Sequence, residues 1–328
     1  MMGLWQLRFG VLATLAAIIG LSTLFFTAVL VLVFNTLNLV VIGIFVIAFN
    51  IIQWLIAPYM IGALYHVREV PKSENTKLHQ MVEEISQKSG LKKPRVMLAN
   101  IPIANAFAYG SPIAGTRIAV TSGLLNTLND GEVEAVIGHE LGHVKHHDVQ
   151  VMMFVSILPA IFYYIYITTF YSAMFSRGRD DRGSGAVLIG LASLVVYFVL
   201  TLFTLYLSRL REYFADRHSA SVVEDGSRKL SVGLAKIVNS THKLKHVRPN
   251  AVGGNSSLKA LFISDPDRAE ADSIALSQAT GGASDLMLVE NVLRKQVSTA
   301  DRLVELISTH PNIVKRLKAL QELDKASA

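Results

Sequence analysis

The chain has 328 residues, of which 51% are hydrophobic and 17% charged, and its positive mean hydropathy of +0.41 indicates a membrane protein rather than a large soluble core. It contains no cysteine, which excludes disulfides, thiolate catalysis and cysteine-based zinc sites, so any zinc must be held by histidine and carboxylate. The net charge of +6 comes from basic residues spread among acidic ones, which favours attraction to a membrane surface over nucleic-acid binding.

The chain begins with two uncharged apolar runs, from residue 9 to about 34 and from 37 to about 65. Each is longer than the ~20 residues that a membrane-spanning helix needs. A cleaved signal peptide is the alternative for the first run, but the run is too long and lacks a small-residue exit site. Arg8 precedes the pair and Arg68 and Lys72 follow it, so the positive-inside rule places both ends in the cytoplasm.

A segment of mixed α and β character comes next. Residues 73–89 have the apolar spacing of an amphipathic helix, which Gly90 would end. Short β-type runs follow at 95–99, 106–109 and 117–121, separated by proline and glycine. These runs predict a small sheet beside the following helix.

That helix is predicted from Asp130, which can cap its N-terminus, and it contains the sequence His-Glu-x-x-His. His139 and His143 lie on one helical face, where both imidazoles can bind one metal ion. Two imidazoles leave room on Zn²⁺ for a third protein ligand and a water molecule, whose pKa falls toward ~7 on the metal. Glu140 can accept the proton of that water and pass it to a leaving amine. The pattern therefore indicates a metal-dependent hydrolase, and a chance match is the alternative.

A second apolar pair is expected at about 149–175 and 185–208, with a re-entrant hairpin as the alternative. The last run continues without glycine or proline into residues 209–216, which predicts one helix that carries both a span and its cytoplasmic extension. Glu212 and Asp216 share a face of this extension. One carboxylate can therefore bind the metal while the other supports a ligand or a helix.

Three blocks occur in a fixed order, namely Asn105-Ala106-Phe107-Ala108, the His-Glu-x-x-His sequence, and Arg-Glu-Tyr-x-Ala-Asp at 211–216. With the paired apolar spans on either side, they resemble the HtpX-type membrane zinc endopeptidases, relatives of the CAAX prenyl proteases. The resemblance implies one Zn²⁺ per chain with the ligands His139, His143 and Glu212, the general base Glu140, and Asp216 as support for a zinc histidine. It also implies that Asn105, Ala106, Phe107 and Ala108 form an edge strand on which a peptide substrate lies extended.

The sequence Ser308-Thr309-His310-Pro311, followed by Arg316 and Leu317, also resembles the closing block of that family. His310 could donate to the developing oxyanion, or it could simply precede a helix whose first residue is Pro311. His147 is the alternative to Glu212 as third ligand. This alternative is disfavoured because ligands along one helix cannot easily surround a tetrahedral ion. The segment of residues 266–307 is longer than the corresponding segment expected of that family.

We therefore expect a mainly α membrane protein with about four transmembrane helices and a cytoplasmic, zincin-like α+β catalytic domain that contains a small β-sheet. The expected organisation is a two-helix hairpin at 1–65, a catalytic segment with the metal helix at 66–148, a second helix pair at 149–208, and a catalytic segment with the third ligand and C-terminal helices at 209–328.

The expected function is a zinc-dependent endopeptidase of the cell membrane that acts in stress response and quality control. Its partners would be the lipid bilayer and misfolded membrane proteins or unfolded polypeptides, with no nucleic acid. An intramembrane-type regulatory metalloprotease is less favoured, because charged residues flank the motif. A zinc scaffold or metal transporter is less favoured because the four spans contain no acid or histidine and Glu140 is present. A CAAX-processing role is also less favoured, because four transmembrane spans are too few to form the large chamber that those enzymes have.

Overall fold

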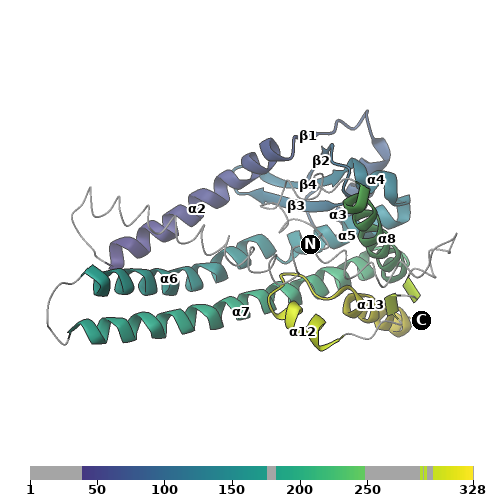
Figure 1. Cartoon of the computed structure of the whole chain (residues 1–328). Coiled ribbons are helices and arrows are strands. Elements are labelled where there is room, and N and C mark those ends of the chain that lie inside the picture. Colours follow the sequence, from purple (N-terminus) through teal and green to yellow (C-terminus); the bar gives the residue numbers. More distant parts are fainter. Residues whose placement is uncertain (1–38, 176–181, 248–288, 291, 294–297, 328) are drawn as a thin grey trace. The chain divides into compact units, whose positions relative to one another are not determined.

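The computed structural model describes residues 39–175, 182–247, 289–290, 292–293 and 298–327 (Figure 1). The chain divides into two compact units, each built from separate stretches of sequence. The first unit contains residues 1–54 and 150–206, and the second contains residues 55–149 and 207–328.

Three helices in the described part of the chain are long and apolar enough to cross a membrane. They are α2 (Leu39–Leu64), α6 (Asp148–Phe175) and α7 (Arg182–Val222). Large apolar side chains such as Ile44, Leu188 and Phe203 are exposed along them, as expected for surfaces that face lipid. The mainly α membrane fold is thus confirmed, whereas the first expected run at 9–34 lies outside the described residues.

Helix α7 extends well beyond its apolar run. It is a single helix of 41 residues that continues through Glu212 and Asp216. The sequence predicted this continuity, because no glycine or proline interrupts the passage from the apolar run into the charged one.

The second unit contains a mixed sheet with the strand order β1-β2-β4-β3. The strands are β1 (Val67–Glu69), β2 (Arg95–Ala99), β3 (Ala106–Ser111) and β4 (Gly115–Thr121). Strand β2 is antiparallel to β1 and parallel to β4, and β3 is antiparallel to β4, with Ala106 opposite Val120. Strand β3 therefore forms one edge of the sheet. Three strands match the expected β-type runs, whereas β1 has only three residues, too few to give a recognisable alternation.

The main hydrophobic core lies on one face of the sheet. Helices α3 (Thr76–Ser89), α5 (Asp130–Lys145), α8 (Gly226–Val247) and α13 (Ile313–Ser327) contribute to it, together with inward side chains of the strands. Phe107 and Tyr109 of β3 point to the other face, where they pack with Tyr65. Two short helices, α4 (Ser122–Thr127) and α12 (Thr299–Leu306), complete the described elements.

The ends of α3 and α5 are fixed by side-chain and glycine caps. Asn75 accepts a hydrogen bond at the start of α3, and Gly90, with a φ of 69°, ends it as the sequence predicted. Helix α5 is capped by Asn129 instead of the expected Asp130, which is the first residue of the helix. Asn129 forms a reciprocal capping box with Glu132. An asparagine directly before an aspartate offers two candidate caps one residue apart, and the glutamate three residues after Asn129 decides between them.

Candidate metal centre

Two glycines on α5 bring α7 close to the His-Glu-x-x-His sequence. A Cβ atom added at Gly142 would lie 3.0 Å from the Cα atom of Ala215, and one added at Gly138 would lie 3.1 Å from Oγ of Ser219. The Ser219 hydroxyl also donates a hydrogen bond of 2.6 Å to the carbonyl of Ala135. This close packing places the carboxylates of α7 beside the histidines of α5.

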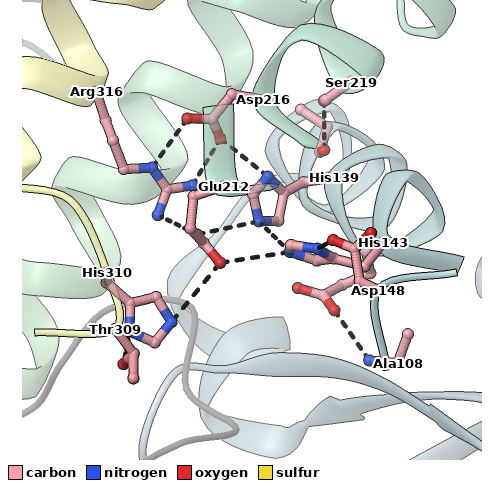
Figure 2. A network of polar contacts seen from close by, with 12 residues as sticks. Ala108, His139, His143, Asp148, Glu212, Asp216, Ser219, Thr309, His310 and Arg316 are labelled. Carbon is pink, nitrogen blue, oxygen red and sulfur yellow. Dashed lines mark hydrogen bonds and ion pairs between the residues drawn. The ribbon is translucent and has the colours of Figure 1, made fainter. Parts of the chain in front are cut away.

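The three residues expected to hold the metal lie together and point toward one another (Figure 2). One ligand atom from each of His139, His143 and Glu212 lies within 4.8 Å of the others. The two Nε2 atoms of the histidines are 3.2 Å apart. The Glu212 carboxylate lies 3.7 Å from Nε2 of His139 and 3.5 Å from Nε2 of His143.

This donor set fits a zinc ion. Two nitrogen ligands with bonds of ~2.0–2.1 Å to tetrahedral zinc are roughly 3.3 Å apart, which agrees with the observed 3.2 Å between the Nε2 atoms. The Nδ1 atom of each imidazole contacts a carboxylate, so each Nε2 is left to face the shared point. Two imidazoles and one carboxylate are also the ligand set of many catalytic zinc sites.

Asp216, which the family resemblance predicts as support for a zinc histidine, lies beside His139. Its Oδ1 atom lies 2.9 Å from Nδ1 of His139. Arg316 from α13 donates to both oxygens of Asp216, at 2.6 and 2.9 Å, and its Nη1 atom is 3.0 Å from Glu212. Burial alone would lower the pKa of Arg316, but the carboxylates of Asp216 and Glu212 outweigh it and raise that pKa. Arg316 is therefore a buried cation that holds both carboxylates of α7.

Glu140 is buried beside the ligand cluster and is fixed by the edge strand. Its Oε2 atom accepts a hydrogen bond of 2.9 Å from the backbone N–H of Ala108. Burial raises the pKa of Glu140, although the neighbouring His143 and His139 and this N–H act in the opposite direction. A carboxylate with a raised pKa is a stronger base.

The stretch expected to bind substrate is buried except at Ala108, which is half-buried. Strand β3 begins at Ala106, and Asn105 before it has both backbone groups bonded to Thr121. Asn105, Ala106 and Phe107 are buried, whereas Ala108 and Gly110 are half-buried. Because Ala108 N–H points away from β4, alternation along the strand also turns the backbone groups of Gly110 toward the open edge.

His310 lies at the margin of the ligand cluster. Its Nε2 atom is 3.7 Å from Oε1 of Glu212, and its Nδ1 atom is 3.0 Å from the Thr309 hydroxyl (Figure 2). Pro311 is not the first residue of a helix, because α13 begins only at Ile313. The expectation that His310 directly precedes a helix starting at Pro311 is therefore wrong. The side chain of Asn312 caps the helix instead.

His147 lies outside the cluster that His139, His143 and Glu212 form. Helix α5 ends at Lys145, and His147 is exposed with a φ of 54°, so the chain has left the helix before a third histidine could join the other two.

Besides Arg316, two residues at the site were given no role by the sequence analysis. Asp148, the first residue of α6, places Oδ2 2.6 Å from Nδ1 of His143, and Arg211 of α7 forms an ion pair with Asp148. Asp148 is one of the charged residues that flank the His-Glu-x-x-His sequence, and the sequence alone indicates no further role for it. Its position five residues after His143, beyond the helix end, gives no periodic signal.

Comparisons with known proteins agree with this geometry. The sequence pattern of peptidase family M48 matches residues 72–324. The protease HtpX homolog of Thermoplasma acidophilum is 35% identical over 291 residues, which cover 88% of this chain and 86% of that protein. The homolog of Aeropyrum pernix is 38% identical over 280 residues, 84% of this chain and 83% of that protein.

A likeness in fold extends to a solved structure. The crystal structure of S. mikatae Ste24p matches with a TM-score of 0.53 at 17% sequence identity. The match covers 94% of this chain but only 64% of the longer Ste24p chain. At this identity the likeness concerns the fold alone.

Proposed function

The chain belongs to peptidase family M48 and is an HtpX-like metalloendopeptidase, and from this premise we propose which residues and substrates it uses. His139, His143 and Glu212 hold one zinc ion per chain, and Glu140 is the general base. The observation that carries this proposal is the convergence of both imidazole Nε2 atoms and the Glu212 carboxylate beside the buried Glu140.

Each residue of the site has a separate role in peptide hydrolysis. When bound, zinc supplies a Lewis acid that acidifies a water molecule and polarises the scissile carbonyl. The Glu140 carboxylate accepts a proton from the attacking water and later donates it to the leaving amine. Asp216 holds the imidazole of His139 through Nδ1, and Arg316 holds Asp216 in turn.

The substrate binds as an extended strand at the half-buried end of β3. Ala108 and Gly110 offer backbone groups to it, so affinity comes from main-chain hydrogen bonds and tolerates many sequences. The Ala108 N–H donates to Glu140 in the free enzyme, which links the binding strand directly to the base. Asn105, Ala106 and Phe107 complete the buried part of this strand and hold it in place.

His310 faces the carboxylate side of the zinc site and donates to the developing oxyanion. Its Nε2 atom, 3.7 Å from Glu212 Oε1, is close enough to the cluster for this role.

The substrates are misfolded or damaged membrane proteins, cut at a site that faces the cytoplasm. Glu212 lies on the helix that also contains an apolar run, only four residues after Ser208, so the zinc site is close to the membrane surface along the chain. Proteins in the same bilayer would then be presented at high local concentration, and selectivity would come from tethering.

The first test compares the wild type with Glu140→Gln after purification in detergent. Both proteins should contain one zinc ion, but only the wild type should cleave an unfolded protein such as casein, because an amide cannot accept the proton. A loss of about 10²–10⁴-fold is expected for a general base. Full activity of Glu140→Gln, or a wild type without bound metal, would contradict the proposal.

The orientation can be tested because the chain contains no cysteine. A Ser73→Cys variant has one thiol, in the exposed turn before α3. A membrane-impermeant maleimide should label it only after the cells are permeabilised. Labelling of intact cells would place the site outside.

The substrate class is tested with one unfolded segment offered to the enzyme in liposomes, either free or fused to a transmembrane anchor. The anchored form should be cleaved faster. Equal rates would leave a general peptidase that is merely anchored in the membrane.

A further inference from the structure

We propose that Asp148 is a positioning residue that orients His143 toward the metal, and that Arg211 holds Asp148 in place. The inference rests on the proposed zinc site. It begins from the 2.6 Å contact between Oδ2 of Asp148 and Nδ1 of His143. An ionised carboxylate can only accept at this distance, so Nδ1 of the neutral imidazole carries the proton and Nε2 presents its lone pair.

The rest of the site shows the same arrangement a second time. Nδ1 of His139 is 2.9 Å from Asp216, and Asp216 is bound by Arg316. Nδ1 of His143 contacts Asp148, which forms an ion pair with Arg211. Each expected zinc histidine thus has its own carboxylate, and each carboxylate its own guanidinium. This repetition indicates that the contact of Asp148 belongs to the metal site.

The backbone between α5 and α6 explains how Asp148 reaches His143. The chain leaves α5 at His146 and turns at His147, whose φ of 54° is uncommon for a residue with a side chain. After this turn, the carboxylate of Asp148 lies against His143 in the last turn of α5. Had α5 continued as a helix, residues 143 and 148 would point in different directions. Five residues rotate by ~500°, which is one full turn plus ~140°.

The ion pair with Arg211 has two consequences. It neutralises a carboxylate whose side chain is only 10% exposed, and it fixes the direction of that carboxylate. Arg211 also donates a hydrogen bond of 2.9 Å to the carbonyl of His146. One guanidinium therefore holds both the carboxylate and the turn that carries it, and it does so next to the ligand Glu212 on the same helix.

The experiment measures zinc affinity in the full-length protein, purified in detergent, by competition with a chromophoric chelator. Asp148→Leu removes the acceptor at similar size and should weaken zinc binding by ~10–100-fold, the usual range for a group that orients a metal ligand. Asp148→Asn keeps an oxygen that can accept the hydrogen bond of His143 but loses the negative charge. Its zinc affinity should therefore lie between those of the wild type and Asp148→Leu. The absorption spectrum of the cobalt-substituted protein should change in Asp148→Leu, because the ring of His143 is no longer fixed.

Glu134→Leu is the matched control. Glu134 is also on α5 and is paired with a cation, Lys229 at 3.8 Å, but it lies more than one helical turn before His139. It should bind zinc as the wild type does. Wild-type affinity and an unchanged cobalt spectrum in Asp148→Leu would overturn the inference. If Asp148→Leu does not fold, wild-type zinc affinity and an unchanged cobalt spectrum in Asp148→Asn would overturn the inference.

The two proposals fail in different ways. A wild type that binds no zinc removes the proposed function and this inference together. A wild type that binds zinc tightly and Asp148 variants that bind it equally well remove only the inference.

Discussion

The two histidines of the site have the same kind of partner but very different surroundings. On the inner side, His139, Asp216 and Arg316 are almost completely buried, with side-chain exposures of 1, 3 and 2%. On the outer side, His143, Asp148 and Arg211 have exposures of 20, 10 and 12%. The same set of contacts is therefore made once inside the core and once at its margin.

The inner side is also built from more distant parts of the chain. Its three residues come from α5, α7 and α13, so it forms only when these helices have packed. On the outer side, the histidine and its carboxylate are separated by five residues, and only the arginine comes from elsewhere. We infer that the inner side supports both the fold and the metal, whereas the outer side acts mainly on the metal.

The largest effect is expected for Arg316→Met, which removes the cation of the inner side. Asp216 and Glu212 would remain as buried carboxylates without their guanidinium. Loss of one partner of a buried ion pair costs about 3–5 kcal/mol, so the metal-free protein should unfold at clearly lower temperature or denaturant concentration. The exposed arginine of α12 provides the control, Arg302→Met, which should unfold like the wild type. Similar unfolding of both variants would mean that the inner side does not support the fold.

An intermediate effect is expected for Asp216→Ala. Zinc affinity should fall by ~10–100-fold because His139 loses the group that fixes its tautomer and direction. Stability should fall as well, because Arg316 is left buried without its main partner. Chelator competition and thermal unfolding, measured on the same samples, distinguish the two losses. If Asp216→Ala binds zinc more weakly but is as stable as the wild type, the inner side acts only on the metal, as the outer side does. The inferred difference between the two sides would then be wrong.

The smallest effect is expected for Arg211→Met on the outer side. Arg211 acts on the metal only through Asp148, so zinc affinity should fall by less than the ~10-fold of a direct contact. The free energy of unfolding should fall by less than in Arg316→Met, because the side chains of Asp148 and Arg211 are 10 and 12% exposed and water can partly replace the lost partner. A stability loss as large as that of Arg316→Met would show that the outer side is structural too.

Local patterns of the sequence determined much of this protein. The periodicity of α3, the strands β2 to β4 and the apolar runs of α2, α6 and α7 follow from side-chain spacing, which water or lipid imposes on each segment alone. The same is true of His139, Glu140 and His143, since one turn of helix fixes their relation. Even Glu212 and Asp216 could be found, because an uninterrupted helix carries them on one face.

Only the tertiary structure decided which groups act together. The approach of α7 to Gly138 and Gly142 brings Glu212 to the histidines, and the end of α5 before His147 keeps that residue away. Arg316 reaches the site from α13, and Asp148 reaches it through the turn between α5 and α6. None of these contacts has a period or spacing in the sequence, because they depend on how helices pack and where they end, and both are settled by the free energy of the whole fold.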